Sequence, residues 1–101
     1  MAQFEKYYHN ENQGSVIDYY KGGADRISEI RVYSTEYNFS NGEHFFHTRI
    51  ELSGNCNGYG GLGFKKINSK EAQSRAEADA SAWKKTSAWL KKNENMTVEI
   101  A

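Results

Sequence analysis

The most restrictive feature of this sequence is one long helical segment that follows a series of strand-like runs. Residues 69–92 contain no glycine, and the whole chain contains no proline. Asn68 is placed to cap the start of a helix, and Glu71 has the reciprocal capping-box position three residues later. Asn93 or Asn95 can end the helix. We therefore predict a helix over about residues 69–92.

Small side chains dominate one face of this predicted helix. A spacing of three or four residues places six residues on one line: Ala72, Ala76, Ala80, Trp83, Ser87 and Leu90. A face of small side chains lets a helix lie close to the surface that it covers. We expect its alanine half to press against a β-sheet, with Trp83 and Leu90 supplying most of the apolar area at the other end.

Two strand-like runs joined by a tight turn precede the helix. Residues 26–39 are rich in β-branched and aromatic side chains, and residues 44–53 alternate in polarity. Asn41-Gly42 between them is a strong hairpin signal. Alternation divides the second run into one face with Phe46, Thr48, Ile50 and Leu52 and another with Phe45, His47, Arg49 and Glu51.

Three further segments complete the predicted sheet. A turn leads to a strand over residues 59–67, in which Leu62 and Phe64 can face the core, and residues 96–100 have the pattern of a short closing strand. Residues 1–23 favour a hairpin around NENQG because tyrosine, valine and isoleucine favour strands; a short helix at VIDYY is the alternative. We predict a single α+β domain for the 101-residue chain, with an antiparallel sheet of about four strands and one long helix packed on one face.

Composition narrows the classes of function. The 13 basic and 13 acidic side chains cancel, whereas a domain that neutralises phosphates usually carries a basic excess. The single cysteine excludes an internal disulfide and favours a reducing compartment. The first residues lack the apolar core of a secretory signal, and no apolar stretch approaches the ~20 residues of a membrane span. We expect a cytoplasmic protein that does not bind membranes.

Catalytic, cofactor and metal sites are not indicated by the sequence. Isolated glycines without the strand–turn–helix spacing of a phosphate cradle favour close strand packing instead, and this applies to Gly58, Gly60, Gly61 and Gly63. His44 and His47 are three residues apart on a predicted strand, so they point to opposite faces and cannot share a metal. Cys56 lacks an evident base. We predict a non-enzymatic protein without a cofactor.

The sheet face opposite the helix is the main candidate for a binding surface. It is expected to combine aromatic and cationic side chains, as protein-binding hot spots do. The predicted contact residues are Arg31, Tyr33, Tyr37, Arg49, Tyr59 and Lys65. Two alternatives remain: this face is merely solvated, or the N-terminal hairpin covers it. Because the net charge is zero, nothing opposes self-association, and both a monomer and a homodimer are compatible with the sequence.

A second candidate surface lies at the start of the predicted helix. Its four cations are Lys65, Lys66, Lys70 and Arg75. Together with the strand–strand–strand–helix order, this cluster resembles the lysine-rich second helix of double-stranded-RNA-binding domains. That family has consecutive lysines in the first helical turn, whereas Glu71 follows Lys70 here. The resemblance implies nucleic-acid binding as the alternative function.

A second resemblance covers residues 44–85. The segment FHTRIEL, the turn-rich NGYGGLG and an alanine-rich helix with AWKK are similar to the central hairpin and helix of small phage-encoded anti-CRISPR proteins, in particular inhibitors of type I surveillance complexes. The resemblance implies a compact, non-enzymatic protein of the host-cell cytoplasm. Its partner would be a host protein or ribonucleoprotein complex, which it would block sterically. A small adaptor or an immunity protein fits the same features.

Overall fold

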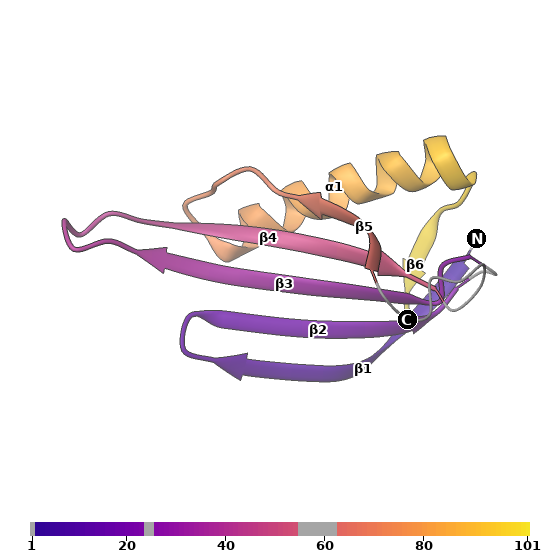
Figure 1. Ribbon diagram of the computed structural model, residues 1–101, viewed down its shortest axis with the longest axis horizontal. Coiled ribbons are helices and arrows are strands. Elements are labelled where there is room, and N and C mark those ends of the chain that lie inside the picture. Colours follow the sequence, from indigo (N-terminus) through magenta and orange to yellow (C-terminus); the bar gives the residue numbers. More distant parts are fainter. Residues whose placement is uncertain (1, 24–25, 55–62) are drawn as a thin grey trace.

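The computed structural model describes residues 2–23, 26–54 and 63–101, which form one sheet and one helix (Figure 1). The elements in chain order are β1 (Ala2–Asn12), β2 (Ser15–Gly22), β3 (Glu29–Asn38), β4 (His44–Ser53), β5 (Gly63–Asn68), α1 (Arg75–Glu94) and β6 (Val98–Ile100). The six strands are ordered β5-β4-β3-β2-β1-β6. Neighbouring strands are antiparallel except β1 and β6, which are parallel.

The α+β class is confirmed, whereas the predicted strand number and purely antiparallel pairing are wrong. The difference arises at the chain ends. The N-terminal segment forms the predicted hairpin, β1–β2, rather than a helix, and it extends the sheet sideways by pairing β2 with β3. The closing strand β6 then pairs with the first residues of β1. Both N-terminal strands are therefore part of the sheet and do not lie over its face.

The predicted Asn41-Gly42 turn connects β3 and β4. Gly42 has a φ of 88°, a left-handed conformation that glycine adopts without steric cost. The Asn41 side chain accepts a hydrogen bond from the backbone N–H of Glu43 at 3.0 Å. This hairpin extends beyond helix α1 at one end of the molecule (Figure 1), so its tip receives no support from the helix.

Helix α1 begins later than the sequence predicts, at Arg75, and its cap is Ser74 rather than Asn68. Residues 69–72 instead continue along the edge of β4. The Ser69 N–H donates to the Thr48 carbonyl at 2.8 Å, and Phe46 and Ala72 exchange two backbone hydrogen bonds of 2.7 and 2.9 Å. These sheet contacts satisfy the backbone of a segment that would otherwise extend the helix, and they protect the edge of β4 beyond β5.

The helix face that meets the sheet also differs from the predicted one. The buried helix residues are Ala78, Ala82, Thr86 and Leu90. The predicted burial of Leu90 is thus confirmed, and Trp83 is half-buried against the core. Three other residues of the predicted face are exposed: Ala76, Ala80 and Ser87. Small side chains do allow the helix to pack closely on the sheet, as predicted. The alanines that do so are Ala78 and Ala82 instead of Ala76 and Ala80. Asn95 ends the helix in the left-handed conformation, with a φ of 49°.

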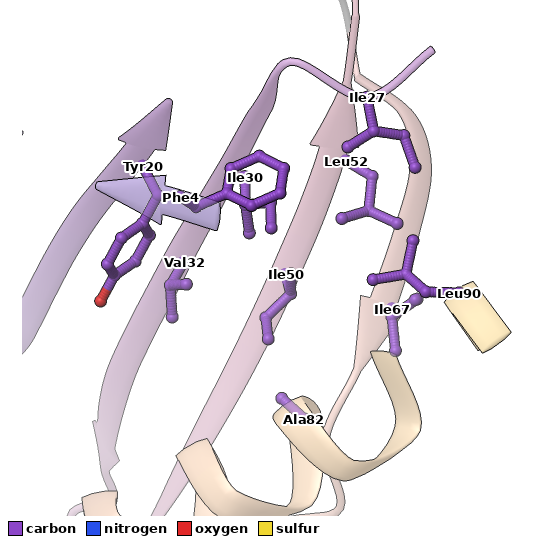
Figure 2. Close-up of a cluster of buried hydrophobic side chains, with 10 residues drawn as sticks. All are labelled: Phe4, Tyr20, Ile27, Ile30, Val32, Ile50, Leu52, Ile67, Ala82 and Leu90. Carbon is purple, nitrogen blue, oxygen red and sulfur yellow. The ribbon is translucent and has the colours of Figure 1, made fainter. Parts of the chain in front are cut away.

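The core lies between the helix and one side of the sheet. Figure 2 shows that side chains from five strands, from Ile27 before β3 and from α1 meet there. Ile30, Ile50 and Leu52 are fully buried. These residues occupy even positions of β3 and β4, so the odd positions of the same strands point to the opposite side of the sheet.

Candidate functional site

The sheet side opposite helix α1 carries the candidate site, and we call it the outer face. It is formed by the side chains that alternate with the buried ones. Tyr33 and Arg49 lie directly opposite one another across β3 and β4, and Ile17 of β2 is the next neighbour of Tyr33. None of the described helical or strand segments packs over this face; the N-terminal hairpin widens it.

A row of tyrosine and arginine side chains crosses the outer face. The Arg31 guanidinium carbon lies 4.6 Å from the Tyr19 ring centroid, and that of Arg49 lies 4.9 Å from the Tyr33 ring. Tyr19 and Tyr33 meet edge to face at 6.1 Å, and Tyr8 adds a third ring 4.9 Å from Tyr19. We call Tyr8, Tyr19, Arg31, Tyr33 and Arg49 the Tyr–Arg row. Each stacking contact fixes a side chain before any partner arrives, which lowers the entropy cost of binding.

Both arginines of the row are paired with carboxylates. The Arg31 Nε donates to Glu29 at 2.6 Å, and the Arg49 Nε donates to Glu51 at 2.9 Å. Each pair is two residues apart on one strand, so alternation places both members on the outer face. Glu29 also accepts a hydrogen bond from the Tyr7 hydroxyl. The centre of the outer face is therefore close to electrically neutral, although it is rich in charged groups.

The hydroxyls of Tyr7 and Tyr33 remain protonated over the physiological range. Burial, followed by the hydrogen bond with the Tyr19 hydroxyl, raises the pKa of Tyr33 to about 12. The two hydroxyl oxygens are 3.4 Å apart. The hydrogen bond to Glu29 is the main cause that raises the pKa of Tyr7. These phenols thus act as neutral hydrogen-bonding groups and add no charge.

An aromatic group continues the outer face toward the β3–β4 turn. Tyr37 and Phe45 stack at 5.0 Å, and Phe39 approaches Phe45 at 5.7 Å. Tyr37 is 43% exposed and Phe39 51% exposed. Large exposed apolar side chains that gather in one place indicate an interaction surface more strongly than scattered ones do.

The structure brings four of the predicted contact residues together: Arg31, Tyr33, Tyr37 and Arg49 share the outer face. Tyr59 lies outside the described residues. The predicted position of Lys65 on the outer face is wrong, because this residue pairs with Leu52 and its Nζ lies 5.4 Å from the Trp89 ring, on the helix side. A register irregularity between β4 and β5 changes the alternation there.

The four cations proposed as an RNA site do not form one cluster. Lys65 is on the helix side, while Lys66 lies opposite Glu51 on the outer face. Arg75 is held over β3, where its Nη1 donates to the Ser34 carbonyl at 2.9 Å and to the Ser34 hydroxyl at 2.7 Å. A continuous phosphate-binding groove would need these charges on a single surface.

Sequence reasoning missed the part of the outer face that comes from the N-terminal hairpin. Tyr8 pairs with Tyr19, and Tyr19 pairs with Arg31, so two early tyrosines join the row. The Tyr-Tyr dipeptides at residues 7–8 and 19–20 were the available signal, since at least one member of each had to face outward. A bulge at Tyr7 between Lys6 and Tyr8 lets both tyrosines of β1 lie on the outer face, where the Tyr7 ring is 6.1 Å from that of Tyr19.

The remaining chemical candidates add no second site. His44 lies beside Phe46 at 6.0 Å and His47 lies beside Arg49 on the outer face, so the two histidines are on opposite sides as predicted. Within the described ranges, no group of three histidine or acidic side chains could hold a metal ion. Cys56 and three of the four clustered glycines, at positions 58, 60 and 61, lie outside those ranges.

Comparison with known proteins gives no relative. No protein-family model, curated protein or solved structure matches this chain. Across the portion that the structure describes, no helix combines the length and apolar character needed to cross a membrane. The candidate site therefore stands on the geometry of the outer face.

Proposed function

We propose that this chain is a small, non-enzymatic binding protein that docks a partner protein on its outer face. The Tyr–Arg row is the observation that supports this function. Tyrosine and arginine are the residue types enriched among the side chains that dominate binding energy in protein interfaces. The stacking contacts at 4.6 and 4.9 Å hold Arg31 and Arg49 in place, so a partner would meet a preorganised surface.

The pairing of the arginines favours a protein partner over a nucleic acid. Nucleic-acid affinity comes largely from cations that release counterions from phosphates. Glu29 and Glu51 compensate Arg31 and Arg49 through hydrogen bonds of 2.6 and 2.9 Å. A phosphate backbone crossing this face would meet the two carboxylates as well, whereas a protein surface can present both donors and acceptors to the paired groups.

The partner that we propose is a host defence complex of the type I CRISPR surveillance class, which the protein would block by steric occlusion. The resemblance of residues 44–85 to anti-CRISPR proteins supports this choice. A sheet presenting a wide face, carried by only 101 residues, suits occlusion, because such a mechanism requires contact area but no catalytic group.

The test is binding of the full chain to purified type I surveillance complex. We expect Tyr33→Ala and Arg49→Ala each to weaken binding by about 30-fold, and the double variant by up to about 1,000-fold, since each anchor contributes on the order of 2 kcal/mol. The matched control is Lys84→Ala/Lys91→Ala on the exposed helix side, which should bind like the parent. If Tyr33→Ala/Arg49→Ala binds the complex as tightly as the parent, the outer face is not the binding site.

The same proteins also test the RNA-binding alternative. A gel-shift with double-stranded RNA at two salt concentrations would show affinity that falls steeply with salt if phosphates are neutralised. We expect no shift at physiological salt. RNA binding that disappears when Lys66, Lys70 and Arg75 are changed to glutamine, together with no binding to the surveillance complex, would replace our proposal by the RNA-binding function.

A further inference from the structure

A small hollow lies on the outer face between the Tyr–Arg row and the aromatic group at the β3–β4 turn. Its volume is about 160 Å³. Its main lining side chains are Ile17, Tyr33, Thr35, Tyr37, His47 and Arg49. The strand register explains why it forms: Ser15 and Thr35 are opposite one another, and His47 completes their rung. The two small side chains leave space beside the larger ones of the next rung, Ile17, Tyr33 and Arg49. The hollow is thus a product of side-chain size at one register position.

The lining of the hollow is basic and contains no carboxylate among the described residues. Arg49 supplies a permanent cation, and His47 supplies a ring nitrogen next to it. The Arg49 Nε is committed to Glu51, which leaves the guanidinium with further N–H donors for another acceptor. Glu51 itself lies opposite Lys66 on β5, and this cross-strand cation offsets the carboxylate that would otherwise repel an incoming anion.

The walls of the hollow strengthen any charge pairing inside it. Tyr33 and Tyr37 line two sides, and Ile17 adds an aliphatic side chain. Such walls shield one side of Arg49, whose side chain is 41% exposed, and they lower the local dielectric constant on that side, which increases the attraction between opposite charges. The hydroxyl of Thr35 is a further hydrogen-bond donor at the floor. The volume corresponds to about five water molecules, which is the scale of one amino-acid side chain.

We propose that this hollow binds the carboxylate of an aspartate or glutamate side chain presented by the partner protein. The inference rests on the proposed function, and it specifies the chemistry of the partner at the centre of the contact. The carboxylate would accept charge-assisted hydrogen bonds from Arg49 and the neighbouring donors. The Tyr–Arg row and the aromatic group would then pack around this contact and exclude water from it.

The test uses two small probes that differ in one group: the N-acetyl, N-methylamide derivatives of glutamate and of glutamine. Each is titrated into the isotope-labelled full chain and followed by NMR. We expect the glutamate probe to produce saturable shifts of the Arg49 Nε–H and His47 ring signals, with a dissociation constant in the millimolar range for so small a ligand. The glutamine probe should bind at least about 5-fold more weakly, because it lacks the charge that the guanidinium recognises.

Three variants locate the binding. Thr35→Phe fills the hollow and keeps both basic side chains, so it should abolish the shifts; Arg49→Gln removes the cation and should do the same. Lys21→Gln removes one positive charge from the same face, opposite Glu29 on β3, but does not line the hollow, and it should retain binding within about 2-fold. Amide spectra report whether each variant keeps its fold.

The possible results separate the two proposals. Equal binding of both probes, or glutamate binding that survives in both Thr35→Phe and Arg49→Gln, would overturn the carboxylate site. Neither result bears on the surveillance complex, because the probes require no partner. Selective glutamate binding with no binding to that complex would keep the site and refute the proposed partner.

Discussion

The Thr48 hydroxyl of β4 donates a hydrogen bond of 2.6 Å to the Asp79 carboxylate of helix α1. This contact joins the sheet to the first half of the helix, where the interface contains serine, threonine and arginine in place of large apolar residues. Thr48 is fully buried, and its backbone N–H donates a hydrogen bond to the Ser69 hydroxyl oxygen at 2.9 Å. The helix is therefore positioned at one end by a polar network and at the other by the apolar core around Leu90.

Thr48→Val keeps the shape of the side chain and removes the hydroxyl. We expect the free energy of unfolding to fall by about 1–3 kcal/mol, because Asp79 loses a donor in a partly buried position. Urea unfolding measures the change. Thr35→Val on the outer face is the control, since Thr35 makes no recorded side-chain hydrogen bond to the described residues, and it should alter stability by less than about 0.5 kcal/mol. Equal effects of both variants would contradict the assigned role of Thr48.

Ser74 is the residue that caps helix α1, and its hydroxyl accepts a hydrogen bond from the Glu77 N–H at 3.2 Å. Ser74→Ala should lower the free energy of unfolding by about 1 kcal/mol. Asn68→Ala tests the cap expected from sequence alone. Its exposed side chain belongs to the last paired residue of β5, opposite Arg49, and does not cap the helix, so this variant should stay within about 0.5 kcal/mol of the parent. A larger loss of stability for Asn68→Ala than for Ser74→Ala would mean that Asn68 caps the helix, as the sequence predicts.

The central hairpin could be predicted from sequence because its signals are local. Alternation in β4 and the Asn41-Gly42 turn lie within a few residues of one another, and they fix which side chains share a face. This is why the sequence alone places Arg31, Tyr33 and Arg49 on one face. The N-terminal tyrosines of the same face were missed because their partners are set by the pairing of β2 with β3, which no local pattern specifies.

The predictions of the helix start and of the position of Lys65 were wrong for a different physical reason. Asn68 and Glu71 satisfy the local rule for a capping box, but Ala72 pairs with Phe46 on the sheet edge instead. Tertiary hydrogen bonding outweighed the local preference. Lys65 was placed by counting alternate residues along a strand, and the register irregularity beside Ser53 breaks that count. Such changes depend on the partner strand and leave no mark in the sequence of β5 itself.

His9 provides a pH-dependent element on the N-terminal hairpin. The hydrogen bond to Asp18 is the main cause that raises the pKa of this imidazole above 6.5, and Glu11 adds to it through the other ring nitrogen at 3.2 Å. Because the folded-state pKa is raised, the stabilisation is complete below about pH 6.5 and is lost as the pH rises through the folded-state value.

NMR titration of the His9 ring should show this raised pKa. Asp18→Asn should return it toward the ordinary value, and Glu11→Gln should lower it less. A His9 pKa that does not respond to Asp18→Asn would exclude this pairing.

Ala82 and Ala80 distinguish the observed helix face from the one that spacing alone suggests. Ala82 is fully buried against the sheet, whereas Ala80 is exposed. Ala82→Leu inserts three carbon atoms into the closest part of the interface, and we expect it to destabilise the protein by about 1–3 kcal/mol through overpacking. Ala80→Leu adds the same atoms on the solvent side and should change stability by less than about 0.5 kcal/mol.

Because both substitutions replace alanine by leucine within the same helix, their intrinsic helix propensities cancel. Thermal or urea unfolding of the pair therefore reports packing alone, and a larger loss for Ala80→Leu would mean that the helix presents its other alanine face to the sheet.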